Sequence, residues 1–224
     1  MQAPVRLVLL PRAGGPAACA EVPRAFVTHI TNAFDDGDDG TVVHFIGATG
    51  LAEAAALNVG AWRLRVGARD GAVARRTDAL QGEFPATHPR AHGRPHAVHY
   101  YAGCSRRGKT MDAWVKVCAR TGERTLAVTP GALHMEAVFV PRAGAGSAEV
   151  RGGGARFAPA YNNIIASRGQ DDGYLVGFVL VGGAVFVKVV CARTMRTQCV
   201  VHTPDLNVTG LHACWVDNEL FDAA

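Results

Sequence analysis

The chain has 224 residues and a formal net charge of +4, with 49% hydrophobic but only 7% aromatic residues. This length suffices for one large domain or two small ones with a substantial core. The positive charge is small and the basic residues are spread along the chain, which does not indicate a nucleic-acid-binding protein. No stretch approaches the roughly 18 apolar residues of a membrane-spanning helix. We therefore expect a soluble globular protein with no specific nucleic-acid partner and no membrane partner.

The N-terminal segment 1–21 contains a short apolar run, VRLVLL, and then AACA, which resembles a signal-peptide cleavage site. The run is too short for a signal peptide, and PRAGGP interrupts it. The six cysteines form no CxxC pair and have no metal-ligand spacing. We expect reduced thiols in a cytoplasmic protein, with secretion as the alternative.

The next conspicuous stretch is NAFDDGDDGTVVHFIG (32–47), in which four carboxylates surround two glycines. A calcium loop needs oxygen ligands on alternate residues and a glutamate at its twelfth position. If Gly40 is the glycine of that pattern, its third position falls on Gly37 and its twelfth on Ile46. Neither side chain supplies an oxygen, so the stretch predicts a hairpin turn followed by a strand.

Short motifs recur in a fixed order along the chain. Segments 114–140 (WVKVCARTGERTLAVTPGALHMEAVFV) and 186–216 (FVKVVCARTMRTQCVVHTPDLNVTGLHACWV) share VKV, CART, TP and LH. Segment 62–84 (WRLRVGARDGAVARRTDALQGEF) is a weaker copy. Extended upstream, the three copies cover 22–88, 89–142 and 156–222. Each copy contains strand-length segments of alternating apolar and polar residues, separated by polar turns.

These patterns predict an all-β protein built from three antiparallel β-meander repeats that share one core, in a sandwich or barrel-like arrangement. Only LAEAAALNVG (51–60) has helical periodicity. The predicted organisation is an N-terminal segment (1–21), the first and second repeats (22–142), a Gly-rich linker (143–155) and the third repeat (156–224). We expect the third repeat to pack with the others as one domain.

The repeat unit resembles the DM-nine repeat family, which includes invertebrate mannose-binding lectins. Asn32-Ala33, GDDG and HFIGA follow the family's order in the first copy. QDDG, YLVGF and Val187-Lys188-Val189 follow it in the third, and YYAGC and Val115-Lys116-Val117 in the second. The resemblance spans most of the chain, although Ala48, Cys104 and Phe178 stand where the family has arginine.

The resemblance implies a mannose-type carbohydrate-binding protein rather than an enzyme. The ligand-binding residues that it implies by position are Asp39 with Arg63 or Arg65, Asp172 with Lys188, and Lys116 without an acidic partner. Carboxylates and ammonium groups can hold sugar hydroxyls directly, so no metal and no cofactor are expected. The expected partner is a glycan or a protein ligand, with a homodimer as an option. The same residues are also typical of ordinary turns and solvated strand faces.

Four histidines lie in THPRAHGRPHAVHYY (87–101): His88, His92, His96 and His99. Pro89 and Pro95 disfavour the helix that would bring histidines four residues apart onto one face. We expect a polar surface loop here, with a metal site in the loop as the alternative.

Two other functions stay open. One is an enzyme that cleaves phosphodiesters, with His99, Tyr101 and Lys116 as acid–base residues. The other is a host-factor-binding β-protein without catalysis. Loss of sugar binding on Asp172→Ala or Lys188→Ala would favour the lectin, whereas loss of nucleotide turnover on His99→Ala would favour the enzyme.

Overall fold

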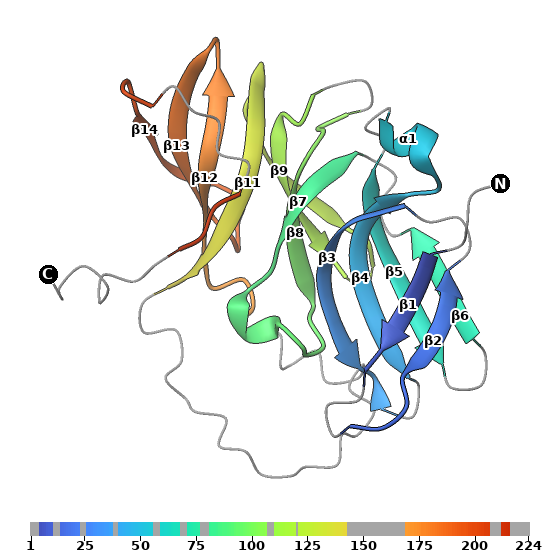
Figure 1. Ribbon diagram of the computed structural model, residues 1–224. Coiled ribbons are helices and arrows are strands. Elements are labelled where there is room, and N and C mark those ends of the chain that lie inside the picture. Colours follow the sequence, from blue (N-terminus) through green and yellow to red (C-terminus); the bar gives the residue numbers. More distant parts are fainter. Residues whose placement is uncertain are drawn as a thin grey trace, which may run out of the picture.

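Strands make up almost all of the regular structure in a computed structural model of the chain (Figure 1). The structure describes residues 5–10, 14–22, 26–37, 40–55, 59–67, 71–76, 81–106, 110–119, 121–142, 169–206 and 212–215. In these ranges the only helices are α1 (Leu51–Ala55) and the 3-10 helix η2 (Pro89–Ala91). Neither of these two helices has the length and the apolar run that crossing a membrane requires.

The described strands form four antiparallel sheets, each from strands consecutive in the chain. The small sheet pairs β1 (Val5–Leu9) with β2 (Ala18–Val22). The first large sheet contains β3 (Phe26–Asp35), β4 (Thr41–Ala48), β5 (Gly60–Gly67) and β6 (Gly71–Arg76). The second contains β7 (Gly82–Ala86), β8 (Val98–Gly103), β9 (Ala113–Cys118) and β10 (Arg124–Val128). The third contains β11 (Ala132–Pro141), β12 (Gly173–Val181), β13 (Ala184–Cys191) and β14 (Thr197–His202).

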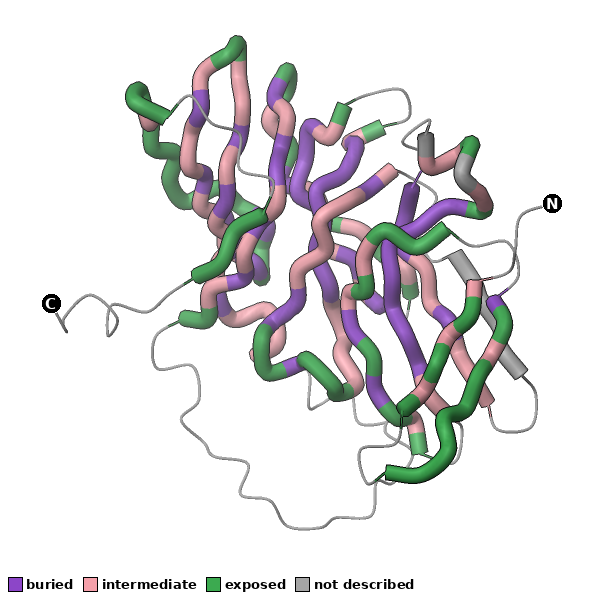
Figure 2. Tube along the Cα trace, in the orientation of Figure 1, coloured by how far each residue is buried: buried purple, intermediate pink, exposed green. Residues whose placement is uncertain are grey.

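The three large sheets lie side by side, with β7–β10 between the other two (Figure 1). The alternation of side chains along a strand explains this position, because successive residues point to opposite faces. On β8, Tyr100 packs into a cluster with Phe139 and Leu175 of the third sheet, and Tyr101 packs into another with Ile46 of the first. The middle sheet therefore buries both of its faces, as Figure 2 shows by the purple strands at the centre.

The hydrophobic core is divided among three clusters. One lies between the second and third sheets around Trp114, and one lies between the first and second around Val115 and Val117. The third joins the β1–β2 sheet to the first large sheet through Val22 and Phe45. The core is thus built between neighbouring sheets.

The prediction of an all-β, antiparallel fold is confirmed. The prediction of three repeats around one shared core differs from the structure, which has four sheets and three core clusters. The third large sheet begins with β11, inside the predicted second copy 89–142, because β11 pairs with β12 across the intervening segment 143–168. The linker 143–155 lies outside the described residues, and the predicted domain boundaries stay a prediction.

Candidate metal centre

Three histidines from two sheets meet in the interior. His44 lies on β4, His99 lies on β8, and His96 lies in the loop that leads into β8. Each offers a ring nitrogen, and these three nitrogens lie within 4.8 Å of one another. No other group of three or more potential metal ligands occurs among the described residues. His44 and His99 are 2% and 1% exposed, so the group lies inside the protein rather than on a surface loop.

Burial keeps all three histidines neutral. It lowers the pKa of His44 to about 2, with further lowering by the nearby His96 and His99. It lowers the pKa of His99 to about 3 and that of His96 to about 4, each again with a contribution from a neighbouring histidine. A neutral imidazole has a nitrogen lone pair available to bind a metal ion, whereas an imidazolium has none.

Five of the six ring nitrogens of this group have no hydrogen-bond partner among the described residues. Both nitrogens of His44, both of His99 and Nε2 of His96 are buried and make no hydrogen bond with the described residues. Buried polar atoms without partners are costly and rare in folded proteins. A metal ion bound by the three imidazoles would satisfy one nitrogen of each, and imidazole ligands suit iron, cobalt, copper and zinc. The donor set therefore fits a transition-metal ion.

The structure also contains a pocket of about 440 Å³, and none of the three histidines lines it. Its lining is mainly apolar and includes Ile30, Pro85, Val138 and Phe139. Asn32 belongs to the lining, and its Nδ2 lies 3.1 Å from Nδ1 of His96. Asn32 thus both lines the pocket and contacts one histidine of the group.

The residues that the sequence analysis selected for sugar binding lie elsewhere. Arg63 and Arg65 lie on β5, and Nη2 of Arg63 lies 3.8 Å from the Asp36 carboxylate. Asp39 lies outside the described residues. On β13, Lys188 is only 2% exposed. It donates to the Ala127 carbonyl at 3.2 Å, to Oγ1 of Thr129 at 2.8 Å and contacts Nε2 of His134 at 3.2 Å.

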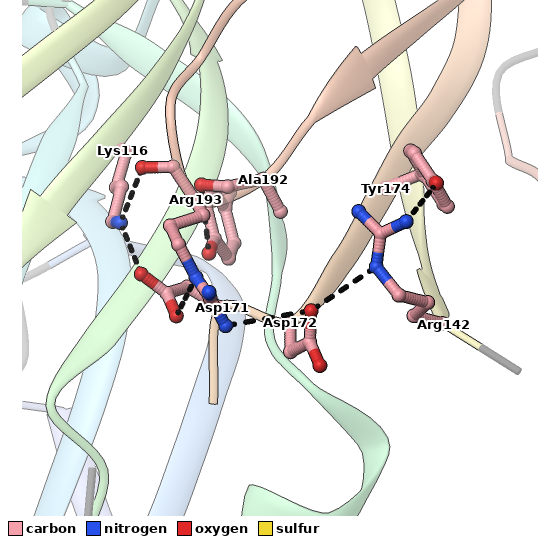
Figure 3. Close-up of polar contacts among 8 residues, drawn as sticks. Lys116, Arg142, Asp171, Asp172, Tyr174, Ala192 and Arg193 are labelled. Carbon is pink, nitrogen blue, oxygen red and sulfur yellow. Dashed lines mark hydrogen bonds and ion pairs between the residues drawn. The ribbon is translucent and has the colours of Figure 1, made fainter. Parts of the chain in front are cut away.

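Asp172 and Lys116 belong to a network of ion pairs between the second and third sheets (Figure 3). Lys116 lies 2.8 Å from the Asp171 carboxylate, and Asp172 lies 3.2 Å from Arg142 and 3.4 Å from Arg193. The predicted pairing of Asp172 with Lys188 is not formed, since Lys188 is held by Thr129 and its neighbours.

His96 and His99 stand out in the sequence as part of the four-histidine segment 87–101, whereas His44 was missed. His44 is the single polar side chain in the apolar strand segment VVHFIG, which the repeat alignment places against the strand that holds His99. A histidine in the matching strand of two copies was the available signal. The expectation of a surface loop followed from Pro89 and Pro95, which do prevent a long helix. However, a strand and the loop before it can also supply metal ligands, as β8 and its preceding loop do with His99 and His96.

The sequence model of the family described as "Retinal pigment epithelial membrane protein" (RPE65) matches residues 1–217. The chain therefore belongs to the RPE65 family. None of the proteins with curated descriptions matches the chain.

Solved structures with a similar fold are apocarotenoid oxygenases. A cobalt-substituted apocarotenoid oxygenase from Synechocystis has a TM-score of 0.75 and 21% identity, over 95% of this chain and 44% of that one. A point mutant of the Synechocystis enzyme has a TM-score of 0.76 and 21% identity over the same shares. An apocarotenoid oxygenase/RPE65 chimera has a TM-score of 0.71 and 20% identity, over 89% and 41%. The chain spans less than half the length of these structures.

Family membership overturns the resemblance to DM-nine lectins and, with it, the predicted carbohydrate-binding function and the glycan partner. The motifs behind that resemblance are short glycine turns and alternating strands, which many antiparallel β-meanders share. The phosphodiester-cleaving and host-factor-binding alternatives do not match the family either. Of the proposed acid–base residues, Lys116 is ion-paired and Tyr101 is only 1% exposed. The remaining partner predictions, including a homodimer, have no support.

Proposed function

We propose that this chain provides a three-histidine metal centre for an oxygenase-type enzyme that cleaves or isomerises a carotenoid or apocarotenoid. The observation that carries the proposal is the buried group His44, His96 and His99, whose nitrogens lie within 4.8 Å of one another. Membership in the RPE65 family and the fold shared with apocarotenoid oxygenases support it.

Iron is the metal we expect, since a redox metal supplies the chemistry by which an oxygenase uses dioxygen on a carbon–carbon double bond. Three protein ligands leave coordination positions open for small molecules, as catalytic metal sites require. The chain's own contribution is to hold three neutral imidazoles in a water-poor interior. The cobalt-substituted relative makes Co²⁺ a suitable probe ion.

The pocket that Asn32 shares with the surroundings of His96 supports a hydrophobic substrate. Ligand pockets for apolar molecules are lined mainly by hydrophobic side chains with a few polar groups. Here Ile30, Val138 and Phe139 supply apolar surface and Asn32 and His92 supply polar atoms. A polyene chain has the shape and polarity for such a lining, whereas a sugar would lose its hydrogen bonds there.

We also infer that the three large sheets are copies of one unit in a propeller-like arrangement. Val115-Lys116-Val117 lies on β9, Val187-Lys188-Val189 lies on β13, and the aligned segment Trp62–Val66 lies on β5. Each of these is the third strand of its sheet along the chain. The motif alignment therefore matches strands of equal position, although the predicted copy boundaries do not match the sheet boundaries.

Metal titration of single-histidine variants tests the proposed function. Wild-type protein is expected to bind one equivalent of Co²⁺ or Fe²⁺, and His44→Ala and His99→Ala are expected to weaken binding by at least about 100-fold, because each removes a ligand. His202→Ala is the matched control, since His202 is exposed on β14. Equal metal affinity in wild type and His44→Ala would refute the proposed centre. Loss of polyene absorbance during aerobic incubation with an apocarotenoid then tests the reaction.

A further inference from the structure

The weakest-supported member of the histidine group is His96. It lies in the loop between η2 and β8 and not on a strand, so ladder hydrogen bonds do not fix its position. The position of its ring therefore depends on the side chains that hold the loop. One of them lies on β3 of the first sheet, and the other lies in the turn before β12.

Asn32 holds the loop from the first sheet. Its Nδ2 donates to the carbonyls of Ala91 at 2.8 Å and Arg94 at 3.0 Å, and its Oδ1 accepts from the backbone N–H of Gly93 at 2.9 Å. A second N–H, that of Ala33, donates to Oδ1 at 2.9 Å. With both donors and the acceptor engaged, the orientation of the amide is fixed.

The strand explains why Asn32 faces this loop. Its Cα partner on β4 is His44, and directly opposite residues of an antiparallel pair point to the same face. The pairing of β3 with β4 shifts register between Ile30 and Asn32. Such a bulge re-aims a side chain, and Asn32 is 5% exposed. Asn32 therefore lies beside one histidine of the group while it holds the loop of another.

The same contacts orient the His96 ring. The Arg94 backbone close to the ring raises the pKa of His96 and so opposes the lowering by burial. Nδ1 of His96 lies 3.1 Å from Nδ2 of Asn32, whereas Nε2 has no partner among the described residues. An Nδ1–H directed at a loop carbonyl would leave the lone pair on Nε2. Nε2 is then the atom free to bind a metal.

Gln170, in the turn before β12, also holds the loop. Its Oε1 accepts from the backbone N–H of Ala97 at 2.7 Å, and its Nε2 donates to the Pro95 carbonyl at 3.4 Å. These two residues flank His96. The turn that contains Gln170 is itself held, because the adjacent Asp171 pairs with Lys116 on β9 (Figure 3).

We propose that Asn32 and Gln170 are positioning residues of the metal centre, two amide side chains that hold loop 88–97 so that Nε2 of His96 faces His44 and His99. The proposal rests on the proposed function, since it concerns the same three histidines. Neither amide is a proposed metal ligand. Both hold the backbone of the loop, and Nδ2 of Asn32 also lies 3.1 Å from Nδ1 of His96.

The first test is a Co²⁺ titration of the full chain, read by the visible absorption of the bound ion. Asn32→Ala and Gln170→Ala are expected to weaken Co²⁺ binding by about 10- to 100-fold, the usual effect of removing a group that orients a metal ligand. Gln170→Glu keeps the acceptor for Ala97 and is expected to restore most of the affinity. Gln198→Ala is the control, because Gln198 makes a similar amide–carbonyl contact on the exposed strand β14.

The second test needs no metal. Histidine ring signals in an NMR pH titration of the metal-free chain report each pKa. Release of the loop in Asn32→Ala or Gln170→Ala is expected to move the pKa of His96 from about 4 toward 6.5, with a smaller rise in the pKa of His44 and His99, which the nearby His96 lowers. A loss of global stability alone would not shift one histidine selectively. If Asn32→Ala does not fold, Gln170→Ala with Gln170→Glu decides the question.

Wild-type binding of Co²⁺, with affinity and spectrum unchanged in both alanine variants and an unchanged pKa of His96, would overturn the proposal. Absence of Co²⁺ binding by the wild type would instead overturn the proposed function. The His96 titration would then still show whether the two amides hold the loop.

Discussion

At the scale of single residues, the clustered histidines make the folded state sensitive to acid. The folded pKa values of His44, His96 and His99 lie below the ordinary value of 6.5. As the pH falls from 6.5 toward about 4, the unfolded chain therefore binds more protons than the folded chain. Stability that is fully present above pH 6.5 is lost over this range.

We expect the free energy of unfolding of the metal-free protein to fall by up to about 1.4 kcal/mol per pH unit for each of the three histidines. Urea unfolding at several pH values between neutral and acidic measures this slope. His44→Gln removes one of the three groups and is expected to flatten the slope. Identical slopes in wild type and His44→Gln would show that burial does not suppress protonation at this position.

Residue types alone indicated part of the candidate site. His96 and His99 stand out in the sequence because four histidines fall within fifteen residues, 87–101. His44 does not stand out, since a lone histidine in an apolar strand is usual in a core. Asn32 and Gln170 carry no sequence signal for their role, because that role depends on backbone groups of a loop far away in the chain.

At the scale of secondary-structure elements, the interface between β11 and β12 depends on a glycine. A Cβ on Gly177 would overlap the Glu136 carbonyl oxygen and would lie 2.8 Å from Cζ2 of Trp114. The pairing of these strands shifts register between His134 and Ala137, opposite this glycine. The Trp114 indole of β9 and the bulge of β11 therefore pack directly against the backbone of β12 at Gly177.

Gly177→Ala is expected to destabilise the protein by about 1–3 kcal/mol, because the added methyl group must displace backbone or the buried Trp114. The midpoint and slope of urea unfolding give this value. Phe178→Ala tests the neighbouring position, whose side chain is only partly buried, and is expected to keep the native pairing of β11 with β12. A Gly177→Ala protein as stable as wild type would mean that β12 and Trp114 do not approach so closely.

Strand type was predictable because alternation along β11 and β12 follows the two-residue period of a half-buried strand. The pairing of β11 with β12 was not predictable in the same way. These strands are separated by the segment 143–168, and strand pairing at such a distance leaves no mark on local periodicity. For this reason the predicted second copy, 89–142, included β11, which belongs to the third large sheet.

At the scale of the whole molecule, three sheets side by side bring together histidines from different strands. Adjacent residues of β8 pack against different sheets. Tyr100 belongs to the cluster shared with the third sheet, and Tyr101 belongs to the cluster shared with the first. His99, one residue before them, meets His44 of the first sheet. In this chain the group draws on two sheets, with His44 on β4 of the first and His99 on β8 of the second.

The predicted carbohydrate-binding function was wrong, and the reason lies in how the sheets pack together. The lectin hypothesis assigned ligands from one turn and one strand within each copy, as a repeat that acts alone would require. In the structure Lys116 of the second sheet pairs with Asp171 in the turn before β12, and Asp172 pairs with Arg142. Lys188 is buried against Thr129 and His134. The repeat motifs therefore mark strands whose side chains hold neighbouring sheets together. The candidate site lies where the first and second sheets meet.

The most direct test of the metal centre is X-ray absorption spectroscopy of the full chain loaded with one equivalent of Fe²⁺. We expect the scattering of three imidazole rings around the metal, with nitrogen ligands from His44, His96 and His99, and the loss of one imidazole in His99→Ala. A shell of oxygen ligands without imidazole scattering, or an unchanged spectrum in His99→Ala, would contradict the three-histidine centre.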